Sequence, residues 1–178
     1  THWQWHYTGS PRSFKMSKNY GTSSLACFIL AFTFQGFAWL LLWPAIALFF
    51  ITLGYLGAGA SVFQKTPEGN ISPSAAILLL PYRLIAWGTY HYFAKHCAQP
   101  SIVSKHIVLG GRPLYALQTQ AVLDMTCEWP RNSYSKGLKY CSQPQIDLLP
   151  LSTEDIEKSV HTMDELVKHG AVYIHCKL

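Results

Sequence analysis

The most extensive feature of the hydrophobic pattern is a long run without charged side chains. Between Lys18 and Lys65 the sequence contains no Asp, Glu, Lys, Arg or His. Its apolar residues would lie all round a helix, whereas a soluble helix keeps a polar outer face. One membrane span needs about 20 apolar residues, so the run has room for two spans and a tight turn. We therefore predict transmembrane helices near 22–41 and 44–63.

The pattern changes after this predicted hairpin. Residues 64–74 are rich in Pro, Gly, Asn and Ser, which predicts a loop. Residues 75–95 are apolar at first but contain Arg83 and His91. Because a charge in the middle of a span costs at least about 2.5 kcal/mol, we favour a helix lying in the membrane interface. A third full span is the alternative, and it would place everything that follows on the other side of the membrane.

From about residue 102 the pattern is that of an α/β domain. The short apolar runs Ile107–Leu109 and Ala121–Met125 are bounded by turn or polar segments, which indicates buried strands. The glycines and proline of 110–113 predict a sharp turn, followed by a short helical stretch to Gln120.

The segment 152–169 has the clearest helical pattern outside the predicted membrane region. Ser152 can cap its start, acidic residues follow in the first turn, and Gly170 can terminate it. Apolar residues recur at helical spacing, namely Ile156, Val160, Met163 and Val167. The apolar residues 171–174 then predict a strand. A helix followed at once by a buried strand predicts an α/β domain whose site lies at the carboxyl edge of the sheet.

Charge and cysteine content narrow the function classes. The formal net charge is +5, but every acidic residue except Glu68 lies after Pro113, so the basicity belongs to the membrane-flanking part. We therefore expect a lipid bilayer and no nucleic acid as partner. The five cysteines are odd in number and form no Cys-x-x-Cys pair, so we expect no disulfide framework, no metal and no cofactor. Basic residues flank both ends of the predicted hairpin, which places these ends in the cytoplasm; they are Arg12, Lys15, Lys18 and Lys65.

The residues with the most suggestive chemistry are His175 and Cys176, directly after the last predicted strand. A cysteine attacks phosphorus well only as a thiolate, which a loop of inward-pointing backbone N–H groups stabilises while it binds phosphate. Lys177 and Leu178 would begin that loop, so we expect the chain to be a fragment. His175 points to the opposite face of the strand from Cys176, so we expect it to orient the loop and to influence the thiolate only indirectly.

The leaving oxygen also needs a proton donor. Asp147 lies in a predicted loop just before the helix at 152–169, which makes it the favoured general acid. Asp124 and Glu128 are competitors. Asp124 can instead be a strand-end residue that bonds backbone, and Glu128 a solvated loop charge.

The order of these features resembles the catalytic core of dual-specificity phosphatases, within the cysteine-dependent protein tyrosine phosphatase superfamily. The resemblance is carried by Gln143-Pro-Gln-Ile-Asp147 and by Gly170-Ala-Val-Tyr-Ile-His-Cys-Lys177. In that family a strand ends in His-Cys, an arginine follows after five residues, and a loop aspartate is the general acid. The resemblance implies that Cys176 is the nucleophile and Asp147 the acid.

The membrane part is similar to the linker of bacterial inner-membrane proteins that fuse a phosphatidic acid phosphatase type 2-like domain to a dual-specificity phosphatase domain. The similar segments are Trp43–Leu48, Phe63–Lys65 and Leu80–Trp87. The motifs of the lipid phosphatase itself are absent, so no residue is assigned to that activity. The resemblance implies a multi-pass inner-membrane protein with a cytoplasmic soluble domain. Its substrates would be phosphorylated proteins or phospholipids.

The predicted fold class is therefore transmembrane helix followed by an incomplete α/β phosphatase domain. We divide the chain into an aromatic and basic segment (1–21), a transmembrane hairpin (22–63), a loop with an interfacial helix (64–98) and the α/β part (99–178). A non-catalytic phosphatase-like membrane module, for binding or scaffolding, is the alternative function. A third reading is a small membrane protein with a regulatory soluble tail.

Overall fold

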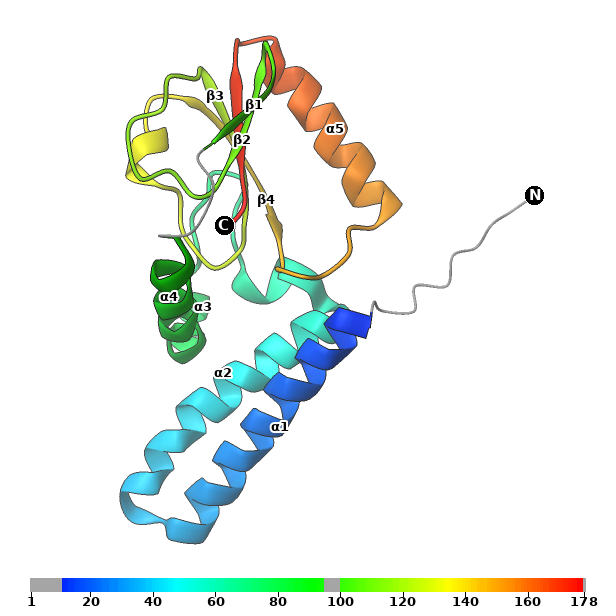
Figure 1. Ribbon diagram of the computed structural model, residues 1–178. Coiled ribbons are helices and arrows are strands. Elements are labelled where there is room, and N and C mark those ends of the chain that lie inside the picture. The colour runs from blue at the N-terminus through cyan, green and yellow to red at the C-terminus, as the bar shows by residue number, and fades with distance from the viewer. Residues whose placement is uncertain (1–10, 95–99, 178) are drawn as a thin grey trace, which may run out of the picture.

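The protein consists of a helical hairpin, two further helices and a mixed five-stranded sheet with one helix packed on it (Figure 1). The computed structural model describes residues 11–94 and 100–177. The predictions for 1–10, for 95–98 and for Leu178 lie outside the described residues. The α/β arrangement predicted for the C-terminal half is present.

The hairpin is formed by α1 (Pro11–Phe34) and α2 (Leu42–Leu53), joined through the 3-10 turn η1 (Gly36–Leu41). Small residues let the two helices approach closely. The Ser24 hydroxyl donates a hydrogen bond of 2.8 Å across the helix pair to the Ala45 carbonyl, and both residues are buried. In the described residues α1 extends back to Pro11, well before the start near residue 22 expected for the first span.

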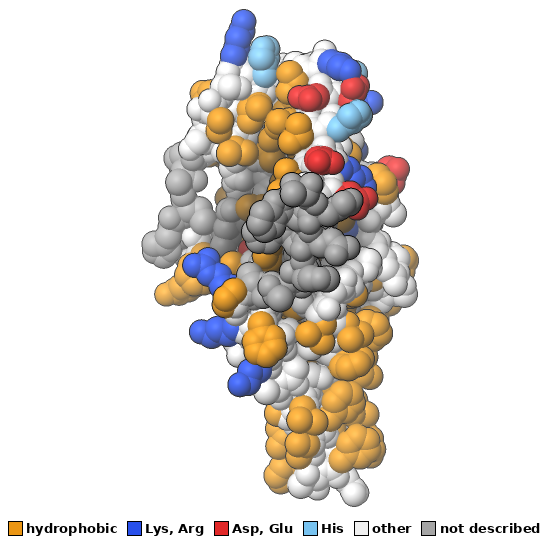
Figure 2. All heavy atoms as spheres, turned by 90° about the vertical axis from the view of Figure 1, so that its right-hand side faces the viewer, with side chains coloured by type: hydrophobic (Ala, Val, Ile, Leu, Met, Phe, Trp, Pro, Cys, Tyr) orange, Lys and Arg blue, Asp and Glu red, His pale blue; other side chains and the backbone are white. Residues whose placement is uncertain are grey.

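The apolar character of the hairpin is evident on its surface. One helical stretch of the described residues, Gly36–Phe63, is long and apolar enough to cross a membrane. In the face shown in Figure 2, hydrophobic side chains cover the far end of the hairpin and no charged side chain appears there. Helix α1 is more polar in its first half, so the expectation of two spans stays a prediction.

The chain unwinds as it leaves α2. A π-helical turn η2 (Gly54–Ala58) and a 3-10 turn η3 (Gly59–Phe63) lead to the loop that contains Lys65. Gly57 and Gly59 have φ angles of 142° and 58°, which only glycine adopts readily. Neither would place a Cβ within 4 Å of another group, so these two glycines bend the chain and do not serve close helix packing.

The predicted loop at 64–74 is found, and it leads into α3 (Pro73–Leu78) and α4 (Leu80–Ala94). The described part of α4 has 15 residues, and α3 precedes it with only one residue between the two helices. Arg83 of α4 turns toward the sheet domain, where its Nε donates to the Glu128 carbonyl at 2.9 Å. This contact places Arg83 against the sheet domain, and the choice between an interfacial helix and a third span stays a prediction.

The sheet has the strand order β1-β2-β5-β3-β4. The strands are β1 (Ser101–Ser104), β2 (Ile107–Gly110), β3 (Ala121–Thr126), β4 (Lys139–Gln145) and β5 (Val172–His175). Only β1 is antiparallel to its neighbour. Strand β5 therefore lies in the middle, parallel to β2 on one side and to β3 on the other.

Helix α5 (Thr153–Val167) covers one face of the sheet. Ser152 caps it as predicted, and its hydroxyl accepts a hydrogen bond from the Asp155 backbone N–H at 3.0 Å. Leu166 of α5 packs with Ala121 and Leu123 of β3 and Val172 of β5. Because side chains alternate along a strand, Asp124 and His175 project from the opposite face.

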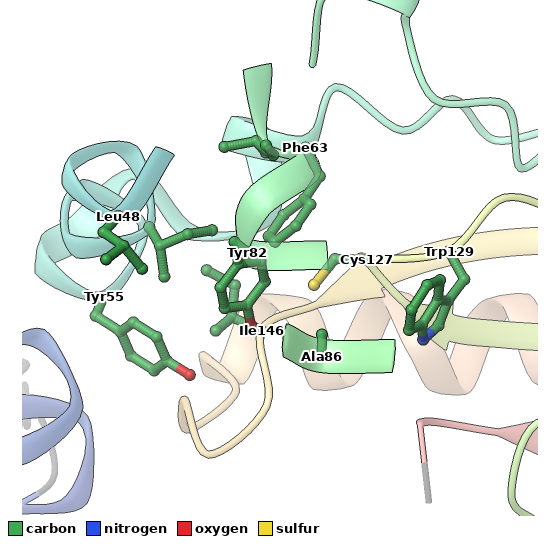
Figure 3. Close-up of a cluster of buried hydrophobic side chains, with 10 residues drawn as sticks. Leu48, Tyr55, Phe63, Tyr82, Ala86, Cys127, Trp129 and Ile146 are labelled. Atoms are coloured by element: carbon green, nitrogen blue, oxygen red, sulfur yellow. The ribbon is translucent and has the colours of Figure 1, made fainter. Parts of the chain in front are cut away.

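A second hydrophobic cluster joins the hairpin to the sheet domain (Figure 3). It contains Leu48 and Tyr55 from the hairpin, Tyr82 from α4, and Cys127 and Ile146 from segments that follow β3 and β4. The helical part and the sheet domain therefore share one core.

The predictions for the α/β part differ from the structure in two places. The short helical stretch predicted up to Gln120 is wrong, because the segment 114–120 is not helical. Its ends are instead held by the Asn132 side chain, which donates to the Pro113 carbonyl at 2.6 Å, and by the Gln120 N–H, which donates to Ala171. Strands β1 and β4 were not predicted. Both are edge strands, and β4 contains Pro144 and several polar residues, so it lacks the pattern of a buried strand.

Candidate functional site

Cys176 follows β5 directly and is exposed at the carboxyl edge of the sheet. Strands β3, β4 and β5 are parallel, so their carboxyl ends share this edge. Asp147 comes two residues after β4, and therefore also lies at this edge. Strands β4 and β5 are separated by β3, so the two loops are about 10 Å apart across the sheet, and the register places Asp147 further along the strand direction than Cys176. The topology thus brings the loops of Cys176 and Asp147 to one region of the molecule.

The side chain of His175 is buried on the face opposite Ile174 and turns toward β3. It is 2 % exposed, and its Nε2 lies 3.8 Å from Oδ1 of Asp124, its neighbour in strand register. Its Nδ1 lies 3.2 Å from the Cys176 carbonyl oxygen. His175 is therefore placed to orient the backbone at Cys176 from within the core.

Asp124 is the centre of a buried polar cluster. The ammonium group of Lys65 donates to Asp124 Oδ2 at 2.8 Å, and the side chains of this ion pair are 0 % and 1 % exposed. The Tyr140 hydroxyl donates to the same oxygen at 2.6 Å. The other oxygen accepts from the Thr126 backbone N–H and hydroxyl, at 2.8 and 2.7 Å. Asp124 is thus fully engaged and is not available as a proton donor.

The ionisation of this cluster follows from burial and pairing. Burial alone would raise the pKa of Asp124, but attraction to His175 and Lys65, with hydrogen bonds from Lys65 and Tyr140, holds this pKa below its usual value. Burial lowers the pKa of Lys65, and Asp124 opposes that shift. Burial likewise lowers the pKa of His175, against the attraction of Asp124. Because such a histidine is neutral at pH 7, Lys65 supplies the positive charge that balances Asp124.

Asp147 lies in a different environment from the buried Asp124. It is exposed, on the loop between β4 and α5, where a proton donor could meet a ligand. Its backbone carbonyl accepts a hydrogen bond of 2.9 Å from the Tyr55 hydroxyl of the hairpin. The following residue, Leu148, has a φ of 63°, so the loop turns sharply there. This geometry is compatible with the role predicted for Asp147.

Glu128 is not the solvated loop charge that its sequence context allowed. It is 2 % exposed, and its Oε1 has no hydrogen-bond partner in the described residues. The guanidinium groups of Arg83 and Arg112 lie 6.0 and 5.7 Å from the centroid of the neighbouring Trp129 ring. Burial and the charge of Glu128 raise the pKa of the Cys127 thiol. Glu128 therefore belongs to the junction with α4.

A large cleft includes Lys65 among its lining residues. Its volume is about 1260 Å³, and it is lined by the start of α1, the end of the hairpin, β4 and the first turns of α5. Cys176, His175 and Asp147 are not among its lining residues. The described part of the chain contains no group of three His, Cys, Asp or Glu side chains that could hold a metal ion.

Sequence reasoning did not single out Lys65, Tyr55 or Tyr140. Lys65 is the first charged residue after a very long uncharged run, a position that predicts a residue flanking the membrane and not a buried ion pair. Its buried side chain cannot contribute to the positive charge at the membrane surface. Arg12, Lys15 and Lys18 are exposed and remain available for that role.

Comparisons of the chain with protein-family models, with curated proteins and with solved structures found no match. The case for a function therefore depends on the residues and geometry described above.

Proposed function

We propose that this chain is the membrane-anchored part of a phosphatase that hydrolyses phosphomonoesters through a phosphocysteine intermediate, without a metal. The observation that supports this function most is the position of Cys176. It is exposed at the carboxyl end of the central strand of a largely parallel sheet, the edge at which such sheets bind ligands. The resemblance of residues 143–177 to dual-specificity phosphatases supports the same chemistry.

The reaction would have two steps. The Cys176 thiolate attacks phosphorus, the phosphorus–oxygen ester bond breaks, and the Asp147 carboxylic acid gives its proton to the leaving oxygen. Water then attacks the phosphocysteine while the Asp147 carboxylate takes a proton from it. The phosphorus–sulfur bond breaks, which releases inorganic phosphate and regenerates the thiolate. His175 would hold the backbone of the nucleophile.

Phosphate binding requires backbone N–H groups and a cation after the nucleophile. Lys177 would begin this loop, and in the family that the chain resembles an arginine of the loop supplies the cation. The protein to be tested is the natural product of the gene that encodes this chain.

The membrane part of the proposal depends on Gly36–Phe63 and on its partner helix α1. The uncharged hairpin would lie in the bacterial inner membrane, and exposed basic residues at the start of α1 would face the cytoplasm. The sheet domain would then act on the cytoplasmic side. Its substrates would be phosphotyrosine or phosphoserine/threonine in proteins, or the phosphate group of a phospholipid.

The experiment compares the wild-type full-length protein with Cys176→Ser and Asp147→Asn, using p-nitrophenyl phosphate, a phosphopeptide and vesicles that contain phosphatidic acid. We expect Cys176→Ser to abolish phosphate release and Asp147→Asn to reduce it by about 100-fold or more. Fractionation before and after carbonate washing tests the anchor. Activity that survives Cys176→Ser would remove the nucleophile assignment. Absence of activity in the wild type, with retained binding of phosphopeptide or lipid, would favour a non-catalytic scaffold.

A further inference from the structure

Two side chains from the segment that follows α2 contact the surroundings of the two candidate catalytic residues. Tyr55 contacts the loop of Asp147. Lys65 contacts Asp124, which neighbours the strand of Cys176. We infer that Tyr55 and Lys65 are positioning residues, Tyr55 for the loop of Asp147 and Lys65 for the strand end that carries Cys176. Both roles rest on the phosphatase function proposed above. The segment between these residues would then be part of the catalytic apparatus in addition to leading out of the membrane.

The loop of Asp147 is docked onto the hairpin by a hydrogen bond and by packing. The Tyr55 hydroxyl donates to the Asp147 carbonyl at 2.9 Å, and Tyr55 itself is 7 % exposed. Ile146, the residue before Asp147, is 4 % exposed and packs in the same cluster as Tyr55 (Figure 3). A Cβ on Gly54 would lie 2.7 Å from Ile146 Cδ1, so the backbone of the hairpin approaches this loop closely. The position of the loop therefore depends on residues 54–55.

The strand end is held through Asp124. The Lys65 ammonium group is bonded to Asp124 Oδ2 and to the Thr126 carbonyl, both at 2.8 Å, at the carboxyl end of β3. Asp124 is paired in register with His175, whose backbone continues into Cys176. Lys65 is itself fixed, because its backbone bridges to Ile71 and the same loop accepts a hydrogen bond from the Ser142 N–H at Pro67. Displacement of Lys65 would release Asp124 from one of its partners and loosen the contact with His175.

The two attachments act on different strands. Asp147 follows β4 and Cys176 follows β5, and β3 separates these strands. One short segment that contacts both sides can set the distance between acid and nucleophile, which the sheet alone does not fix because both residues lie on loops. A misplacement of about 1 Å can reduce a rate about 100-fold, so these contacts are large enough to matter for turnover.

The substitution Tyr55→Phe tests the acid loop, because it removes one hydroxyl and keeps the ring. General acid catalysis matters most for a poor leaving group. We therefore expect the single-turnover rate of phenol release from phenyl phosphate, which reports only the first step, to fall about ten-fold, while the corresponding release of p-nitrophenol changes less than about two-fold. A purely stabilising role would lower both rates in proportion to the folded fraction. Tyr134→Phe, at an exposed tyrosine, is the matched control.

The substitution Lys65→Met tests the nucleophile strand. We expect the rate of Cys176 alkylation by iodoacetamide, followed by peptide mass spectrometry, to fall together with kcat for both substrates, on the order of ten-fold. Tyr55→Phe should leave this alkylation rate unchanged. Lys65→Arg keeps a buried cation and should recover part of both losses. Should Lys65→Met not accumulate as folded protein, Lys65→Met/Asp124→Asn is measured instead, and the same losses are expected.

The outcomes separate the two proposals. Loss of activity in Cys176→Ser, with wild-type leaving-group dependence in Tyr55→Phe and wild-type alkylation in the Lys65 variants, would overturn the positioning roles and leave the phosphatase function standing. Activity that persists in Cys176→Ser would instead overturn the phosphatase function, whatever the other variants do. A leaving-group-dependent loss in Tyr55→Phe, together with slower Cys176 alkylation in Lys65→Met, would support both positioning roles.

Discussion

Replacement of Lys65 by methionine should destabilise the protein strongly, although only one side chain of a loop is changed. Lys65 and Asp124 form an ion pair whose side chains are 0 % and 1 % exposed. Such a pair costs free energy to desolvate, so replacing both charged residues with neutral ones can leave the free energy of unfolding nearly unchanged. Removal of one partner alone is different, since the other charge stays buried without compensation.

The size of the effect can be worked out from the contacts that remain. Breaking a buried pair typically costs about 3–5 kcal/mol. In Lys65→Met the carboxylate of Asp124 keeps its hydrogen bonds from Tyr140 and from Thr126, so we expect the lower end, about 3 kcal/mol. In Asp124→Asn the ammonium group keeps the Thr126 carbonyl and can lose its proton, so we expect a similar cost. The double variant should cost about 2–3 kcal/mol less than the sum of the single variants.

Thermal unfolding of the detergent-solubilised protein, followed by circular dichroism, measures these differences. For a chain of this size 1 kcal/mol corresponds to about 2–4 °C, so each single variant should lower Tm by about 6–12 °C. Lys168→Met is the control, because Lys168 pairs with Glu165 on the exposed surface of α5. Its Tm should equal that of the wild type.

Two results would refute this reasoning. A Tm of Lys65→Met within about 2 °C of the wild type would mean that the ion pair is not buried as described. Strictly additive effects of Lys65→Met and Asp124→Asn would mean that the two charges do not interact. Either result would also remove the physical basis for a positioning role of Lys65.

Three other predictions concern neighbouring features. Burial lowers the pKa of His175, so below about pH 6.5 the unfolded chain binds a proton that the folded chain does not. Tm should therefore fall as the pH is lowered from 6.5, and His175→Gln should flatten this slope. An unchanged slope in His175→Gln would assign the pH dependence to another group. Gly54→Val places side-chain atoms against Ile146 and should cost about 1–3 kcal/mol, while Gly88→Ala, with open space around it, should be neutral or stabilising by up to about 1 kcal/mol; equal Tm values for the two variants would contradict the close approach. Ser152→Ala removes the cap of α5 and should cost about 1 kcal/mol in the same assay, and no loss would show that the cap is dispensable.

Much of the fold could be predicted because its signals are local. Helix α5 has a cap, a first-turn charge pattern and helical spacing, and β2, β3 and β5 are short apolar runs between turn residues. The edge strands lack such signals. All residues of β1 are exposed, and β4 mixes polar residues with a proline. The bounds of α1 were missed because its first half is polar and still helical.

The candidate site was predictable only in part, for a similar reason. Cys176 stands out because it directly follows a recognisable strand, and Asp147 because it lies in a loop just before the recognisable helix α5. The partners of Asp124 do not, because Lys65 is 59 residues away in the chain and reaches it only through the tertiary fold. The buried position of Glu128 likewise results from packing against α4, which nothing in its own neighbourhood indicates.

The position of β5 has a consequence for how the protein is made. Strands β2 and β3 are not paired with each other, and each is paired with β5, which the ribosome delivers after both. Until β5 emerges, each of them presents an open edge that could pair with another nascent chain. The hairpin is synthesised first and, if it inserts into the membrane as proposed, would already hold the growing chain there during that interval. Completion of the sheet and delivery of Cys176 would then be a single late event, so ribosomes stalled before residue 172 should carry an aggregation-prone and still unreactive intermediate.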